Sequence, residues 1–182
     1  MARIAIIGSA GRGEATQFLT PTVFANALAY AKDFVSRYTD VTLVSGGAAF
    51  MDHLAVQLFL LGEAPRLELH LPCPWNTPQW KFKDTGARDW RSNPGGTSNH
   101  YHNKFSVLCR IQSLGELNKV IPRADVHIGA GFRDRNTGIG RVDVLLAFTA
   151  GRGEEPADGG THHTWSASPA PIKVHVPLWG LR

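Results

Sequence analysis

The turn at residues 45–48 combines glycines with neighbouring side chains that bind anions or transfer protons. It follows the apolar run 41–44, and Asp52 lies in the predicted helix behind it. A glycine turn between a strand and a helix leaves backbone N–H groups free, and these groups favour a phosphate at the helix N-terminus. A carboxylate such as Asp52 can stabilise developing positive charge there or activate water. The candidate ligand-binding residues of this turn are Ser45, Gly46, Gly47 and Ala48.

A purely structural interpretation of the same turn stays open. Glycine also serves in a strand-to-helix connection for its permissive backbone dihedrals alone. Asp52 would then stabilise the first helical turn through the helix dipole. Other segments of the chain must decide between the two interpretations.

Residues 8–13 form a second junction between a predicted strand, 3–7, and a glycine loop. The glycine spacing differs from that of a dinucleotide-binding fingerprint. The Ser9 hydroxyl and the Arg12 guanidinium can nevertheless hold a phosphate, the arginine through paired hydrogen bonds. A solvated loop arginine is the alternative. The candidates here are Gly8, Ser9, Gly11 and Arg12 for the ligand, with Glu14 as a second possible catalytic carboxylate.

Two later segments carry side chains of the same kind. Arg135 and Asn136 are expected just before a short helix, where Arg135 either contacts ligand oxygens or braces the turn by bonding to the backbone. Thr161 is expected to cap the next helix and to leave N–H groups free near Gly159 and Gly160. All five residues are therefore candidate ligand contacts.

Apolar runs that alternate with helical stripes predict the elements that position these residues. A strand, a helix and a second strand open the chain, which indicates parallel strands joined by a right-handed crossover. The fold class is α/β. Strands are predicted at 3–7, 41–44, 66–72, 125–129, 142–148 and 173–178, and helices with buried stripes at 21–35, 51–61 and 105–117.

Residues 73–104 form a polar, aromatic segment that we expect to be a long inserted loop or lid. Its aromatic side chains alternate with basic ones, a pattern that suits stacking on a base while phosphates are neutralised. Alternatively, the aromatics pin the loop to the body of the protein. His100 and His102 are too close in sequence for a helical metal-binding pair, so no metal site is predicted. The aromatic residues concerned are Trp75, Trp80, Trp90 and Tyr101.

Composition sets the remaining bounds. The 182 residues suit one domain, 1–182, and 43% hydrophobic with 19% charged residues is an ordinary globular balance. The net charge of +4 permits a phosphate ligand or weak nucleic-acid contact. Cys73 and Cys109 form no metal or redox motif, and no apolar run reaches the ~20 residues of a membrane span. We expect a cytoplasmic protein with free thiols, no membrane contact and no cofactor.

At this point two motifs resemble a known family. Residues 45–48, with Asp52 and Ala55 behind them, resemble the S-G-x-A-x-G-x-D-x-x-A turn of the DNA-processing protein A family. Phe132, followed by Arg135-Asn136, resembles that family's F-x-x-R-N segment. Residues 158–161, Asp-Gly-Gly-Thr, look like the turn that opens a late helix in the wider SLOG superfamily, which includes the lonely-guy phosphoribohydrolases and the YpsA-like proteins.

The resemblance implies a Rossmann-like parallel sheet with helices on both faces and a ligand at the carboxyl ends of its strands. Three hypotheses follow. In the first, the protein binds a nucleotide or nucleotide-derived ligand, with the sensing of a signal as one such role. In the second, it hydrolyses the N-glycosidic bond of a nucleotide through Asp52 or Glu14. In the third, it binds single-stranded nucleic acid. Related folds often dimerise, and the apolar face at 58–61 suits either a homo-oligomer interface or the core.

Overall fold

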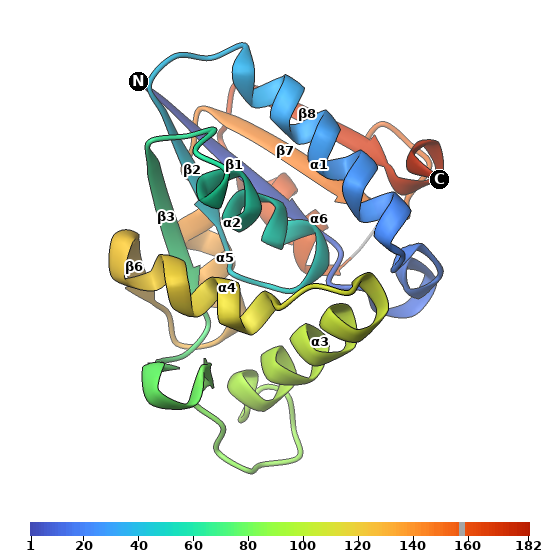
Figure 1. The fold of residues 1–182 in the computed structure, drawn as a ribbon. Coiled ribbons are helices and arrows are strands. Elements are labelled where there is room, and N and C mark those ends of the chain that lie inside the picture. Colours follow the sequence, from blue (N-terminus) through green and yellow to red (C-terminus); the bar gives the residue numbers. More distant parts are fainter. Residues whose placement is uncertain (157–158) are drawn as a thin grey trace.

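The computed structural model describes residues 1–156 and 159–182, and a six-stranded sheet forms its centre (Figure 1). The strand order is β6-β3-β2-β1-β7-β8, and every neighbouring pair is parallel. The predicted α/β class with a parallel sheet is therefore confirmed. The strands are β1 (Ala2–Gly8), β2 (Val41–Ser45), β3 (Arg66–Leu71), β6 (Asp125–Ile128), β7 (Val144–Thr149) and β8 (Ile172–Pro177).

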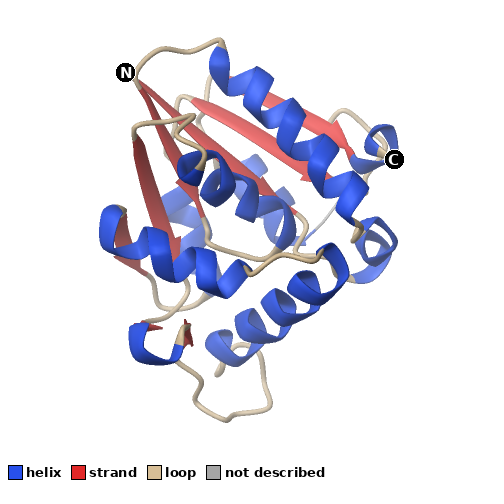
Figure 2. Ribbon diagram, in the orientation of Figure 1, coloured by secondary structure: helices blue, strands red, loops and turns tan. Residues whose placement is uncertain are grey.

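Helices cover both faces of the sheet, as Figure 2 shows. Ile4 and Ile6 of β1 pack into the larger apolar core, with the first four helices, whereas Ala5 and Ile7 pack into a smaller core with the last two. This alternation is the two-residue period of a strand buried on both sides. The first face carries α1 (Pro21–Ser36), α2 (His53–Leu60), α3 (Pro94–Cys109) and α4 (Ser113–Val120), and the second carries α5 (Phe132–Ile139) and α6 (Gly159–Ala167).

The direction of winding reverses between β1 and β7, which are hydrogen-bonded neighbours. After β1 the chain passes through α1 to β2, and after β7 it passes through α6, on the opposite face, to β8. The loops that leave these two strands diverge, so a crevice opens at their carboxyl ends. In open α/β sheets this switch point is where ligands bind.

The start of α1 follows directly from the sequence. Thr20 Oγ1 accepts a hydrogen bond from the Val23 N–H at 3.2 Å, and Pro21 occupies the first helical turn, where its missing N–H costs nothing. Phe24 and Ala31 are buried against the sheet. The predicted start and buried stripe of this helix are confirmed.

The buried apolar stripe predicted for the helix at 51–61 is wrong at its C-terminal end. Met51 and Leu58 are fully buried, but Leu61 is 56% exposed because α2 ends at Leu60 and the chain turns away at Gly62, whose φ is +77°. The apolar face at 58–61 is therefore split between core and surface.

The segment 73–104 is more ordered than predicted. It opens with a small antiparallel hairpin, β4 (Trp75–Asn76) and β5 (Lys81–Phe82), joined by the 3₁₀ turn η3 (Thr77–Gln79). Residues 94–104 are helical rather than loop, because the Asn93 side chain accepts the Gly96 N–H at 2.9 Å and caps α3. The predicted helix at 105–117 is also wrong, since α3 ends at Cys109 and Arg110, with φ +57°, separates it from α4.

Short 3₁₀ turns and buried thiols complete the description. Cys73 and Cys109 are both buried and unpaired within the described part of the chain, and burial raises the pKa of each thiol to about 11.

Among residues 1–156 and 159–182, no helix has both the length and the apolar character needed to cross a bilayer. The remaining turns are η1 (Gly13–Phe18), η2 (Phe50–Asp52), η4 (Ile121–Arg123) and η5 (Leu178–Leu181).

Candidate functional site

A cavity of about 740 Å³ opens at the carboxyl ends of the central strands. Such a volume lies within the usual range for small-molecule sites, ~300–1,000 Å³. The cavity lies at the switch point between β1 and β7, because the loops that leave these strands form part of its wall. Its lining comes mainly from residues 7–15, 48–52, 97–101, 132–139, 149–151 and 159–164.

Most of the candidate residues from the sequence meet at this cavity. The eleven that line it are Gly8, Ser9, Arg12, Glu14, Ala48, Asp52, Arg135, Asn136, Gly159, Gly160 and Thr161. Asp158 lies outside the described residues. The four that do not line the cavity formed by the described residues are Gly11, Ser45, Gly46 and Gly47.

Three of those four shape the turn after β2 from behind. Ser45 Oγ donates to the Asp52 carbonyl at 2.8 Å and accepts the Gly47 N–H at 3.2 Å. A Cβ at Gly46 would lie 2.8 Å from Asp52 Oδ2, so only glycine lets this carboxylate approach the backbone. These residues therefore position Asp52 and need not touch a ligand themselves.

Gly11 holds the loop after β1 in the same indirect way. Its φ is +82°, which favours glycine, and its N–H donates to Ser9 Oγ at 3.1 Å. Its carbonyl accepts from Lys104 Nζ of α3 at 3.0 Å. Both backbone groups of the residue before Arg12 are thus hydrogen-bonded. Arg12 itself is exposed, with its guanidinium carbon 5.6 Å from the Tyr101 ring centroid.

Asp52 lies at the cavity wall with only 3% of its surface exposed. Its Oδ1 accepts the Gly8 N–H at 2.9 Å. Burial raises the pKa of Asp52, while the charge of Arg135 and backbone N–H groups of Gly8, Ala48 and Gly46 act in the opposite direction. A buried carboxyl group with a raised pKa in a cavity is the arrangement expected of an acid–base group, and Asp52 also joins the β1 and β2 loops.

Arg135 lies within α5, and not before a helix as the sequence analysis expected. Its Nη2 and Nε donate to Asn136 Oδ1 at 2.8 and 3.1 Å, and burial lowers its pKa. Asn136 Nδ2 in turn donates to the Gly160 carbonyl at 3.4 Å, which links α5 to α6. Arg135 is therefore both braced by its neighbour and part of the cavity wall.

Thr161 does not cap α6. The helix begins at Gly159, so Thr161 lies in its first turn, where its side chain lines the cavity. Gly159, with φ +75°, is the first residue of the helix and has a left-handed backbone conformation that favours glycine, and Gly160 follows it within the helix. The first N–H groups of α6 have no partner within the helix, as at any helix start, and they lie at the cavity.

The aromatic residues of the segment 73–104 divide between the two predicted roles. Trp75 Nε1 donates to Asn118 Oδ1 at 2.9 Å and its ring packs edge-on against Phe82, so Trp75 pins the hairpin to the body. Trp90 and Tyr101 line the cavity. Trp90 also lies near Phe132 of α5, with ring centroids 6.0 Å apart.

His102 is a structural residue that the sequence analysis missed. It is fully buried, and its ring nitrogens lie 3.0 Å from the Gly47 carbonyl and 3.0 Å from Ser113 Oγ. Burial is the main reason that the pKa of His102 falls to about 3. The segment 73–104 is thereby tied to the glycine turn after β2. The buried residues of α3 recur every three or four positions, the period of a helix with one buried face. They are Gly95, Ser98, His102, Phe105 and Cys109.

Other cavity residues were not predicted as ligand contacts. They are Thr97, Ser98, Thr149, His163 and Thr164, and four of these five carry only a small hydroxyl side chain. Thr149 ends β7, the most apolar strand, so its position at the carboxyl edge could have been predicted from the strand alone.

Comparison with known proteins places the chain in a family. No protein-family model and no solved structure matches it. The chain is 34% identical over 185 residues to "Uncharacterized protein R261" of Acanthamoeba polyphaga mimivirus, and the match covers 97% of this chain and 96% of the viral protein. A match of this extent includes nearly all of the sheet and the loops that line the cavity. The chain therefore belongs to the same protein family as the mimivirus protein R261.

Proposed function

We propose that the protein binds a nucleotide or a nucleotide-derived phosphate ester in the cavity at the switch point. The observation that carries this proposal is the convergence of the loops after β1 and β2 with the first turn of α6 on one cavity at the carboxyl edge. In parallel α/β folds this edge is where phosphorylated ligands are bound. The SLOG-like sequence motifs, which include the turn after β2 and part of α5, favour the same class of ligand.

The phosphate would be held by two arginines and by backbone N–H groups. Arg12 is exposed at the cavity and Arg135 is partly buried in its wall, and both present planar donor groups suited to phosphate oxygens. The N-terminal turn of α6 adds the partial positive charge of a helix start.

The base would stack on the aromatic side chains of the opposite wall. Trp90, Tyr101 and Phe132 offer ring surfaces to the cavity. Stacking of a base on an aromatic ring contributes ~1–3 kcal/mol, so Trp90→Ala should weaken nucleotide binding by about 5-fold or more. Trp80→Ala is the matched control, because Trp80 is 58% exposed and does not line the cavity of the described residues.

Thermal unfolding of the protein with a panel of nucleoside monophosphates, ADP-ribose and NAD tests the proposal. A ligand that binds the native state alone raises the melting temperature with its concentration. We expect at least one member of the panel to do so and a titration to give one site per chain. A labelled single-stranded oligonucleotide belongs in the panel, and binding to it alone, lost steeply with salt, would replace this proposal with nucleic-acid binding.

Hydrolysis of the N-glycosidic bond is the second candidate, and the position of Asp52 favours it. The leaving base of such a reaction departs from a sugar that develops positive charge, and a nearby carboxylate stabilises it or activates water. Asp52 is buried at the cavity wall and Glu14 lies at its exposed rim.

Chromatography for free base after incubation with the same panel distinguishes the two candidates. Released base, abolished in Asp52→Asn while nucleotide binding persists, supports the hydrolase. Stabilisation by a nucleotide without released base supports binding alone.

A further inference from the structure

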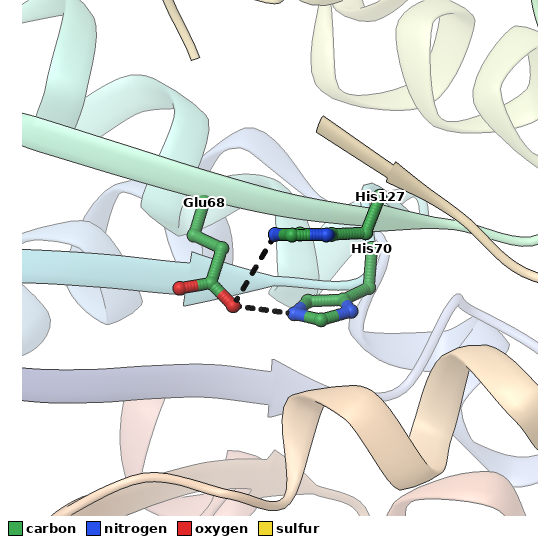
Figure 3. Close-up of side chains that lie close together, drawn as sticks. All are labelled: Glu68, His70 and His127. Atoms are coloured by element: carbon green, nitrogen blue, oxygen red, sulfur yellow. Dashed lines mark hydrogen bonds and ion pairs between the residues drawn. The ribbon is translucent and has the colours of Figure 1, made fainter. Parts of the chain in front are cut away.

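Three side chains that the proposed function does not use gather at the far edge of the sheet (Figure 3). Glu68 and His70 lie two residues apart in β3 and so project from the same face. His127 of the edge strand β6 is the register partner of His70. The two imidazole rings stack, with centroids 4.8 Å apart and an interplanar angle of 20°.

The donor atoms of this cluster converge on one carboxylate oxygen. His70 Nε2 lies 2.6 Å from Glu68 Oε1, and His127 Nε2 lies 3.9 Å from the same atom. One donor atom from each of the three residues lies within 4.8 Å of the other two. Figure 3 shows both rings directing a nitrogen towards the carboxylate.

We propose that Glu68, His70 and His127 bind a divalent transition-metal ion of the zinc or cobalt class. Two neutral imidazoles and one carboxylate are a common ligand set for such ions and leave further coordination positions open. Each ring binds with its proton on Nδ1, which frees the Nε2 lone pair for the ion. Metal–ligand bonds of ~2.1 Å span at most about 4.2 Å between two ligands, so a small rotation of the half-exposed His127 side chain completes the set.

The surroundings leave room for the ion and its remaining ligands. A groove of about 290 Å³ runs beside the two histidines and is lined further by Gly129 and Thr137. Gly138 of α5 packs against the His70 ring, since a Cβ there would lie 2.3 Å from His70 Nδ1. The position of α5 therefore restricts His70, whereas His127 is half-exposed on the edge strand β6.

Charged neighbours of the cluster determine the affinity for the metal ion that we expect. Arg3 donates to both Glu68 oxygens at 2.7 Å, and its positive charge opposes a cation. Asp125 Oδ2 lies 3.3 Å from His127 Nε2 and supplies negative charge on the exposed side. The opposing charge of Arg3 predicts binding weaker than that of a four-ligand structural zinc site.

Titration of the metal-free full chain tests the inference, with Zn²⁺ by calorimetry and Co²⁺ by visible absorption. We expect one equivalent of Zn²⁺ to bind, visible bands from bound Co²⁺, and a rise in melting temperature with Zn²⁺. His127→Ala should lower the Zn²⁺ affinity about 10-fold or more and remove the thermal shift. His127→Gln serves as a second variant, and the melting temperature without metal verifies the fold of both.

His100→Ala is the matched control, because His100 is an exposed histidine of α3 outside the cluster. It should leave Zn²⁺ affinity, Co²⁺ bands and thermal shift unchanged. The inference is overturned if the wild-type chain binds no equivalent of Zn²⁺, or if both His127 variants bind it as the wild type does. These titrations are made without nucleotide, so their outcomes are distinguishable from those of the tests of nucleotide binding.

Discussion

The Gly8 N–H donates to Asp52 Oδ1 at 2.9 Å across a sequence separation of 44 residues. Gly8 ends β1 and Asp52 immediately precedes α2, so this bond joins the first two strand-to-helix connections of the fold. A Cβ at Gly8 would meet the Phe148 carbonyl at 2.3 Å, which shows how closely β7 approaches the same point. The ends of β1 and β7 and the residue before α2 therefore lie close together at the wall of the cavity.

Asp52→Asn should change how stability depends on pH. Burial raises the native pKa of Asp52 above 3.8, so the native state takes up its proton more readily than the unfolded chain. The associated stabilisation is fully present below pH 3.8 and is lost as pH rises through the native pKa. Relative to Asp52→Asn, the wild type should gain free energy of unfolding as pH falls from neutral towards 3.8, measured by urea unfolding. A constant difference contradicts the raised pKa.

His102→Gln should show the opposite pH dependence. Burial lowers the native pKa of His102 from 6.5 to about 3. Between these two pH values, the His102 side chain therefore binds a proton in the unfolded chain and not in the native protein. Wild-type stability should fall by up to ~1.4 kcal/mol per pH unit below pH 6.5. The variant should be less stable than wild type by ~1–3 kcal/mol at pH 7.5, and the gap should narrow at pH 5.

Urea unfolding at the two pH values provides the measurement for His102→Gln. His100→Gln is its control, since His100 is exposed and its replacement should leave the curve unchanged. Parallel pH profiles of wild type and His102→Gln would contradict a neutral buried imidazole.

Gly46→Ala should destabilise the protein by ~1–3 kcal/mol through overpacking. The added Cβ would lie 2.8 Å from Asp52 Oδ2 and 2.9 Å from Ile139 Cδ1. Gly180→Ala is the matched control, because no atom of the described residues lies within 4 Å of a Cβ there, and its cost should stay within ~0.5 kcal/mol. Equal unfolding midpoints for the two variants would show that the β2 turn relaxes freely.

Arg12→Ala should weaken nucleotide binding without affecting the fold. Loss of a charge-assisted hydrogen bond to phosphate costs ~1.5–3 kcal/mol, or about 10- to 100-fold in affinity by calorimetry. The exposed position of Arg12 predicts a change in unfolding free energy within ~0.5 kcal/mol. Arg88→Ala, at an exposed arginine that does not line the cavity of the described residues, should bind as wild type does. Equal affinity in Arg12→Ala would remove this arginine from the phosphate site.

The sheet was predictable because its central strands, β1, β2 and β7, are mostly apolar runs, while β3 alternates apolar and polar residues. Once the strands are parallel, their carboxyl ends lie at one edge, so the glycine loops that follow them were expected to converge there. Helix α3 was not predictable in the same way, since its first ten residues are mostly polar and include Gly95 and Gly96. Its cap, Asn93 followed by Pro94, was the available signal.

The cluster of Glu68, His70 and His127 depends on information that one sequence does not hold. His127 faces His70 only through the register between β3 and β6, and these strands are separated by two helices and a hairpin. The i, i+2 spacing of Glu68 and His70 was visible, but a pair of residues does not make a metal site. Strand pairing supplies the third ligand.

Arg135 lines both hollows of the molecule, the large one at the switch point and the small groove beside the two histidines. Helix α5 therefore lies between the cavity of the proposed nucleotide site and the groove beside the proposed metal site. Suppose that a nucleotide and a metal ion both bind, and that binding of one shifts α5 and changes the affinity for the other. Thermodynamic linkage then requires each ligand to change the affinity for the other by the same factor. Zinc titrations with and without saturating nucleotide would then measure how strongly α5 couples the two sites.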